Sequence, residues 1–438
     1  MIQQALEKLL CGEDLSRTEL DVLSAEFHAG QVGVSQFAAV AVGLYMKGMT
    51  RDERRAAAKV VRSWDSSADP GNPTSANFWI SPGPLDAVIA FAMNGDDLSR
   101  TEAQRAMETI LRGEVPEPQI AQFLSALRFK GETVEEVVGF AAAMRRHAPR
   151  IFPDGHPIAQ EALVDTCGTG GDARGTFNIS TATAFVVAGA GVRVAKHGNR
   201  SHSSPCGSAD VLEHFGVRID LPPERVARCI EEIGIGFLFA PTMHSATRHV
   251  AKVRRELKIR TVFNLLGPLT NPAGASAQVV GVYDPGVTEL MARVLSELGV
   301  KRAFVVHGED GLDEVSISGE TYVSDLRDGA VRNHSLIPED FGLKRAPVEA
   351  IRGGDAKQNA EIIHKILGRS LLYREHTPHR DIVLANASAA LVAAGRTEDL
   401  REGVRIAAES IDSGAAREKL ERLIVFSQSA SESAHSAD

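Results

Sequence analysis

The sequence predicts an α/β protein: a small all-helical N-terminal domain, then a larger α/β domain with a mostly parallel central sheet flanked by helices. Three observations predict this fold. One helical pattern occurs twice in the N-terminal third of the chain. From about residue 162, short apolar runs alternate with helical segments, as in parallel strands joined by crossover helices. Aromatic residues make up only 5% of the chain and glycines number 39, a balance more typical of α/β packing than of an all-β sandwich.

The helical pattern is an internal repeat. Gly12–Glu19 recurs as Gly95–Glu102, 83 residues later, and the same offset pairs Lys47 with Lys130. In the second copy Ser99 and Glu102 predict a capping box at the start of a helix. We therefore expect an extra helical repeat at 1–62 and the helical domain proper at 85–160, with later helical contributions possible.

The rest of the chain divides by composition. A Pro/Gly/Ser-rich linker is expected at 63–84, the α/β domain at 161–426 and a flexible tail at 427–438. Apolar runs predict five strands, and the residues between 319 and 345 predict a small strand-and-loop excursion. The strands are expected at 162–164, 192–195, 237–239, 279–282 and 303–306, and a buried Ala-rich helix at 382–391.

Composition excludes several classes of protein. The chain has 438 residues and a net charge of −9, whereas nucleic-acid binders usually carry a basic excess. Hydrophobic residues at 43% and charged residues at 24% exclude wholesale disorder. We find no apolar run long enough for a membrane span, and acidic residues near the N-terminus argue against a signal peptide. Four cysteines without CxxC spacing predict neither a disulfide scaffold nor a zinc site, and suit a reducing cytoplasm.

A glycine-rich loop follows the first predicted strand. In Asp165–Asp172, three glycines within four residues allow backbone N–H groups to approach an anionic ligand closely. The spacing is not that of a P-loop, and the chain lacks a GxGxxG dinucleotide fingerprint. The loop alone fits phosphate binding and a tight structural turn equally well.

Two further segments favour phosphate binding. Thr176, Asn178 and Ser180 stand at the head of an Ala-rich helix, where free N–H groups attract phosphate, although simple N-capping by Ser180 is an alternative. Lys196–Ser201 and then Ser203–Ser208 follow the second strand, at the strand end where open α/β sheets bind ligands. A solvated basic turn is the weaker interpretation of that segment.

Adjacent carboxylates at Asp313 and Glu314 follow the fifth predicted strand. Hard oxygen ligands of this kind suit Mg²⁺, which is commonly held by a few carboxylates together with substrate phosphates. Taken in isolation, an exposed acidic turn is the more frequent explanation. Arg254 lies on a predicted helix with a basic face, a pattern that is usually only solvated.

Together these segments resemble the anthranilate phosphoribosyltransferases over about residues 85–425. The resemblance rests on seven segments in order: Asp165–Asp172, Asn178–Thr181, Lys196–Ser208, Phe239–His244, Val253–Leu257, Arg260–Pro272 and Asp310–Glu314. It implies the fold stated above and transfer of phosphoribose from phosphoribosyl pyrophosphate to anthranilate, the second reaction of tryptophan biosynthesis. It also implies Mg²⁺, with two ions expected, a homodimer and a cytoplasmic location, without nucleic-acid or membrane partners.

The resemblance also assigns site residues. For phosphoribosyl pyrophosphate it implies Gly168, Gly171, Asp172, Thr176, Asn178, Ile179, Ser180, Thr181, Lys196, His197, Gly198, Asn199, Arg200, Ser201, His202, Ser203, Ser204 and Ser208. For anthranilate it implies Gly168, Asn199 and Arg254, and for the metal Ser180, Asp313 and Glu314. Cys206 receives no role, and no residue is assigned as a general base.

Two alternatives remain open at this level. A pyrimidine nucleoside phosphorylase shares the implied fold, and Leu44–Thr50 of the first repeat resembles its helical domain, but it would not need the Asp313–Glu314 pair. A non-enzymatic nucleic-acid-binding relative is opposed by the net charge and by the intact carboxylates. The extra repeat carries none of the phosphate motifs. It fits equally a second helical module at a dimer surface and a dispensable appendage.

Overall fold

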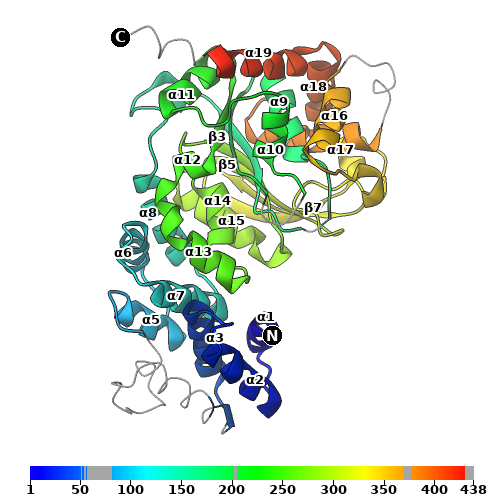
Figure 1. Ribbon diagram of the computed structural model, residues 1–438. Helices are drawn as coiled ribbons and strands as arrows, with labels where there is room; N and C mark the ends of the chain where they lie inside the picture. Colours follow the sequence, from blue (N-terminus) through cyan, green and yellow to red (C-terminus); the bar gives the residue numbers. More distant parts are fainter. Residues whose placement is uncertain are drawn as a thin grey trace. The chain divides into compact units, whose positions relative to one another are not determined.

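Figure 1 shows the chain as a computed structural model, which describes residues 1–50, 52–53, 56, 81–172, 174–201, 205–368 and 377–429. Two compact units are present. The helical unit comprises Met1–His147 and Ala246–Leu266, and the α/β unit comprises Ala148–Ser245 and Gly267–Asp438. Most of the predicted linker, the predicted site residues His202, Ser203 and Ser204, and residues 430–438 of the predicted tail lie outside the described residues.

The helical unit contains both copies of the repeat. Its helices are α1 (Ile2–Leu10), α2 (Arg17–His28), α3 (Val34–Lys47), α5 (Asp86–Met93), α6 (Arg100–Leu111), α7 (Glu117–Lys130), α8 (Val134–His147) and α13 (Arg248–Leu257). The predicted capping box of Ser99 and Glu102 forms at the start of α6, and Ser16 and Glu19 form its equivalent at α2. Helix α13 packs on α3, α6 and α7, so a segment from within the predicted α/β range belongs to the helical unit.

The α/β unit is built on a seven-stranded sheet in the order β3-β2-β1-β4-β5-β6-β7. The strands are β1 (Leu163–Gly168), β2 (Arg193–Gly198), β3 (Ile235–Phe239), β4 (Ala277–Gly281), β5 (Arg302–Gly308), β6 (Thr321–Arg327) and β7 (Ala330–Leu336). Strands β1 to β5 are parallel, and β6 and β7 add antiparallel at one edge. The predicted fold class is confirmed, with the strand-and-loop excursion forming the β6–β7 hairpin.

Helices cover this sheet and enclose its core. They are α9 (Ile179–Gly189), α10 (Ser208–His214), α11 (Pro223–Glu232), α12 (Ala240–Met243), α15 (Thr288–Glu297), α16 (Ala356–Leu367), α17 (Pro378–Ala393), α18 (Leu400–Asp412) and α19 (Ala415–Ser429), while α14 (Phe263–Leu269) crosses the boundary between the units. The predicted Ala-rich helix is part of α17, which is buried from Arg380 to Ala393 and packs on α9, β4 and β5. Helix α19 continues to Ser429, and Ser427 is buried within it. Among the described helices, none combines the length and apolarity required to cross a membrane.

Candidate active site of the α/β unit

The strand order places a switch point between β1 and β4. Crossovers from β1 lead outward through β2 to β3, after which the chain returns to place β4 on the other side of β1. Ligands of open α/β sheets bind beyond the carboxyl ends of the strands at such a point. Here those ends are Gly168 of β1 and Gly281 of β4, which are partners in register. The predicted glycine loop begins directly after Gly168.

The glycine loop turns tightly over the end of the sheet. Gly170 and Gly171 have φ values of 68° and 82°, in the left-handed region that favours glycine. The Thr169 amide donates to the Gly281 carbonyl at 2.9 Å, and the Gly170 amide donates to Asp313 Oδ2 at 2.9 Å. Burial raises the pKa of Asp172 at the end of the loop. The glycine loop is therefore bonded directly to the loop that carries Asp313 and Glu314, which we call the carboxylate loop.

Gly168 and Gly281 make room for Asp313. A Cβ atom on Gly168 would lie 2.5 Å from Asp313 Oδ2, and a Cβ on Gly281 would overlap the Asp313 carbonyl oxygen. Any larger residue at either strand end would displace the carboxylate loop. The need for glycine here comes from this close approach, since neither residue has a positive φ.

Glu314 lies beneath the head of α9. The Ser180 amide donates to Glu314 Oε1 at 3.1 Å, and burial, reinforced by the charge of Asp313, raises the glutamate pKa well above its usual value. From α17, the buried amide of Asn386 bonds both the N–H and the C=O of Val315, at 2.9 and 3.0 Å. The central helix thus fixes the backbone immediately after the two carboxylates.

Lys196 links β2 to the same place. Its ammonium donates to the Thr166 carbonyl at 2.7 Å and to Ser180 Oγ at 3.2 Å. Burial lowers its pKa, although Asp165 and Glu314 oppose that shift. The predicted phosphate-binding lysine is therefore brought together with the predicted metal-ligating serine.

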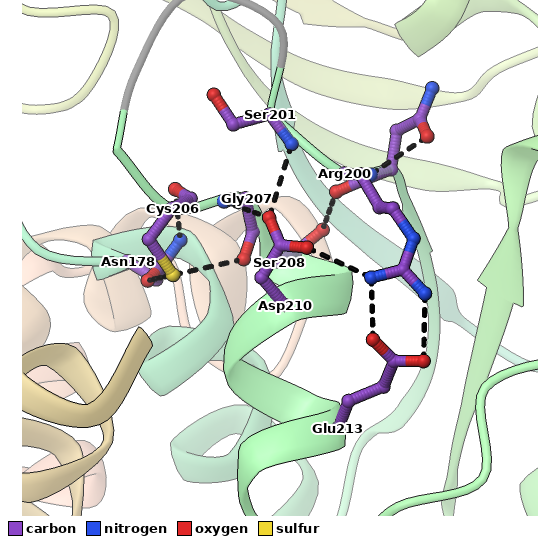
Figure 2. A network of polar contacts seen from close by, with 9 residues as sticks. Asn178, Arg200, Ser201, Cys206, Gly207, Ser208, Asp210 and Glu213 are labelled. Carbon is purple, nitrogen blue, oxygen red and sulfur yellow. Dashed lines mark hydrogen bonds and ion pairs between the residues drawn. The ribbon is translucent and has the colours of Figure 1, made fainter. Parts of the chain in front are cut away.

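The loop after β2 is organised by Asp210 (Figure 2). Its carboxylate accepts hydrogen bonds from the amides of Ser201 and Gly207, at 3.2 and 2.8 Å, and pairs with Arg200 at 3.0 Å. The Arg200 guanidinium also makes two bonds to Glu213, at 2.5 and 2.7 Å. In this state the guanidinium is paired with carboxylates of its own unit.

Asn178 joins three segments of the unit. Its Nδ2 donates to the Cys206 carbonyl at 3.2 Å, and its Oδ1 accepts from Asn359 Nδ2 of α16 at 2.9 Å. The Cys206 thiol donates to the same Oδ1 at 3.4 Å, and Figure 2 draws this contact. Ser208 Oγ donates to the Asn199 carbonyl at 3.3 Å, so the loop's two ends are held together.

The remaining predicted residues differ in exposure. Ile179, Thr181 and His197 are buried, and within the described residues the Thr181 hydroxyl makes no hydrogen bond. Thr176 forms an isolated bridge with Arg352. Gly198 ends β2, and an added Cβ there would lie 2.7 Å from the Phe237 ring. Contact of Ile179 and Thr181 with a ligand stays a prediction.

The donor set fits a cation shared with a phosphate ligand. Among the described residues, no three or more His, Cys, Asp or Glu side chains form a group able to hold a metal ion. Two adjacent carboxylates and the Ser180 hydroxyl are hard oxygen donors, and Mg²⁺ commonly takes its other ligands from phosphate and water. The raised pKa of Glu314 indicates an environment in which a nearby positive charge would favour the carboxylate form.

His197 and His244 form a buried pair with their ring centroids 5.1 Å apart. Burial, with a smaller effect of His244, lowers the pKa of His197 to about 3, and burial lowers that of His244 to about 4. Both rings are therefore neutral in the folded chain, whereas the unfolded chain protonates them near pH 6.5.

We expect this pair to make the fold acid-sensitive. Below pH 6.5 the unfolded state binds more protons, so each ring should lower the free energy of unfolding by about 1.4 kcal/mol per pH unit, until its folded pKa is reached. Urea unfolding at pH 7 and pH 5 measures this slope. His197→Gln should flatten it relative to the unsubstituted chain. An identical slope in the variant would contradict the assignment.

Arg254 belongs to the helical unit, whereas Gly168 and Asn199 belong to the α/β unit. Its guanidinium lies 5.2 Å from the centroid of the Phe263 ring, and burial lowers its pKa. Its helix, α13, is held by both copies of the repeat: Lys252 pairs with Glu117 at 2.6 Å, and Gln36 Nε2 donates to the Glu256 carbonyl at 2.8 Å. Joint binding of anthranilate by Arg254, Gly168 and Asn199 stays a prediction.

Comparison with known proteins defines the class. The a/b domain of a glycosyl transferase family matches residues 160–417, and the helical bundle domain of that family matches twice, at 3–64 and 87–148. An anthranilate phosphoribosyltransferase of Symbiobacterium thermophilum is 56% identical over 342 residues, which cover 78% of this chain and 97% of the relative. The chain belongs to the anthranilate phosphoribosyltransferase family.

Similar solved structures support this family assignment. A crystal structure of anthranilate phosphoribosyltransferase from Thermus thermophilus is 46% identical with a TM-score of 0.72, covering 78% of this chain and 99% of that chain. The structure of the enzyme from Saccharomyces cerevisiae in complex with PRPP and Mg is 30% identical with a TM-score of 0.66. The match covers 76% of this chain and 94% of that chain.

Three residues that organise the site escaped sequence reasoning. Asp210 has a weak local signal, because it stands three residues after Gly207 in a helix-capping pattern. Asn359 and Asn386 have no local sequence signal, because each contacts a site residue that is more than 70 residues away in the sequence. Only the packing of α16 and α17 brings their amides to the site.

Proposed function

We propose that this chain transfers the 5-phosphoribosyl group of phosphoribosyl pyrophosphate to the amine of anthranilate, releasing pyrophosphate, as the second reaction of tryptophan biosynthesis. The proposal rests on the contact between the glycine loop and the carboxylate loop at the switch point between β1 and β4. The glycine loop after β1 bonds Asp313 directly, so a phosphate-binding turn and a pair of metal-type carboxylates share one place.

The chemistry suits this arrangement. The bond from ribose C1 to the pyrophosphate oxygen breaks and its electron pair leaves with pyrophosphate, while the amine nitrogen forms the new bond to C1 and loses a proton to water. Near pH 7 an aryl amine is already a neutral nucleophile, so no strong general base is required. Catalysis then consists mainly of positioning and charge stabilisation.

The chain's own residues supply the positioning. Gly170 and Gly171 let the backbone approach a phosphate without intervening side chains, and the head of α9 offers N–H groups beside it. Lys196 adds a buried positive charge at Ser180. Asn199 and Ser208, which are joined by a hydrogen bond, and Ser201, which bonds Asp210, are proposed to make further phosphate and ribose contacts.

We propose that Mg²⁺ is held by Asp313, Glu314 and Ser180 together with the pyrophosphate of the substrate. The resemblance implies two ions. When bound, the metal supplies positive charge that stabilises the leaving pyrophosphate. The support is the set of hard oxygen donors and the raised pKa of Glu314. The family and the four cysteines without CxxC spacing favour a cytoplasmic location.

A single assay tests the proposal. Incubation with anthranilate, phosphoribosyl pyrophosphate and Mg²⁺ should remove anthranilate fluorescence, and omission of any one component should prevent the loss. Inorganic phosphate with a pyrimidine nucleoside is the matched test of the phosphorylase alternative. Turnover of the nucleoside with none of anthranilate would overturn the proposal.

Arg254→Ala is expected to weaken anthranilate binding far more than phosphoribosyl pyrophosphate binding. A lost charge-assisted hydrogen bond to the substrate carboxylate costs about 1.5–3 kcal/mol, so KM for anthranilate should rise about ten- to a hundredfold. The exposed neighbour Arg255→Ala is the matched control. A rise in KM for the sugar alone would assign Arg254 to the phosphate site instead.

We propose no catalytic role for the first repeat, because the phosphate, metal and anthranilate residues all lie beyond residue 160. The resemblance implies a homodimer. The packing of the two copies within one chain offers an alternative to it.

A further inference from the structure

The two copies of the repeat have the same local structure. Helices α2 and α3 begin and end 83 residues before α6 and α7, so all four boundaries of these two helices recur at the same offset. This agreement extends the sequence repeat to the folded chain. The first copy is therefore a structural equivalent of the second.

A buried ion-pair network is duplicated with the copies. In the first, Lys47 pairs with Asp14 at 2.6 Å and with the buried Glu53 at 3.0 Å. The second copy has the same contacts at the same distances, between Lys130 and the equivalent carboxylates, Asp97 and Glu136. A buried carboxylate is costly unless it is paired and hydrogen-bonded, so both networks are integral to the fold.

The equivalent helices α3 and α7 pack against each other. A Cβ atom on Gly43 would lie 2.6 Å from Cζ of Phe129, which shows how closely the two helices approach. Phe37–Leu44 in α3 and Ile120–Leu127 in α7 are equivalent runs in which every residue is buried. A helix at the surface of a bundle normally leaves one face exposed. Each of these helices packs more extensively against the other than against any other described helix.

We infer that the first repeat is an internal partner for α7, covering the face that a second copy of this helical module would otherwise cover. Pairing of equivalent helices is the arrangement of a two-fold symmetric dimer, in which one patch meets its own copy. Here both patches are carried by one chain. The inference concerns assembly alone and does not depend on the proposed activity.

Covalent connection makes the internal pairing dominant. Residues 57 to 80 join the two copies in one chain, and tethering of this kind gives effective concentrations of about 1 mM. At micromolar protein, a free second chain is about a thousandfold less concentrated than the internal partner. The chain should therefore be monomeric, with α7 already covered.

Sedimentation velocity of the full chain, from about 1 to about 100 μM, tests the inference. We expect the mass of one chain throughout this range. A mass of two chains would overturn the inference, whatever the behaviour of any variant.

A variant at the contact tests the role of α3. Gly43→Glu places a carboxylate against Phe129 and should release α7, giving concentration-dependent association and hydrogen exchange in Glu117–Lys130 faster by about tenfold or more. Ala25→Glu adds the same side chain at an exposed position of α2 and should change neither. Unchanged mass and unchanged exchange in a folded Gly43→Glu chain would overturn the inference. If that variant does not fold, the mass of the unsubstituted chain decides.

Discussion

The double substitution Asp313→Asn with Glu314→Gln is expected to lower kcat by about two to three orders of magnitude while leaving the fold intact. The amide oxygens can still accept the bonds from the Gly170 and Ser180 amides, so the two loops keep their contacts. What is lost is the pair of negative charges proposed to hold Mg²⁺. Because burial already raises the pKa of Glu314, its neutral replacement should maintain or increase the free energy of unfolding.

The comparison requires activity and stability to be measured on the same preparations. Turnover as a function of Mg²⁺ concentration, together with Tm, separates loss of metal binding from loss of fold. Glu309→Gln, at an exposed position shortly before the pair, is the matched control and should leave both measurements unchanged. Turnover like that of the unsubstituted chain at limiting Mg²⁺ would contradict the metal assignment.

Gly281→Ala is expected to lower kcat by about a hundredfold through the backbone rather than through a reacting group. The added methyl group would overlap the Asp313 carbonyl oxygen, so the carboxylate loop must move away from the end of β4. A displacement of about 1 Å is sufficient for such a loss. Overpacking should also lower the free energy of unfolding by about 1–3 kcal/mol.

Gly33→Ala is the control for this substitution. Its added Cβ would lie 3.6 Å from the nearest atom, an ordinary contact, so activity should not change. The measurements are kcat at saturating substrates and Mg²⁺, and urea unfolding. A stable Gly281→Ala chain with full activity would show that the close approach of Asp313 is not required.

The parallel sheet could be predicted because its strands are short apolar runs separated by helical segments. Each of the five predicted strands is present, although most extend beyond the apolar run. In β1, for example, the run ends at Val164, but the strand continues through Asp165 to Gly168. Polar residues can occupy such a strand when the fold supplies partners, as Asn271 does for Asp165 at 2.8 Å. Apolarity alone cannot reveal that.

The candidate site was predictable where the chain is locally unusual. Glycines in succession and adjacent carboxylates are visible in sequence, but the contact between Gly170 and Asp313 spans 143 residues. Asn386 illustrates the same limit, since its amide is an ordinary polar residue of an Ala-rich helix until α17 brings it to Val315. Likewise, the grouping of α13 with the helical unit depends on packing rather than on any local pattern.

Joining two equivalent modules in one chain removes a constraint on their residues. In a homodimer every substitution appears twice, so a cavity on one side of the axis must also appear on the other. Here Gly43 provides space for Phe129, whereas the equivalent positions 83 residues away are Ala126 and Met46. The large ring and the space that receives it each occur once. Mutations can therefore adapt one half to the other without changing both, and the two halves of the pair are free to diverge.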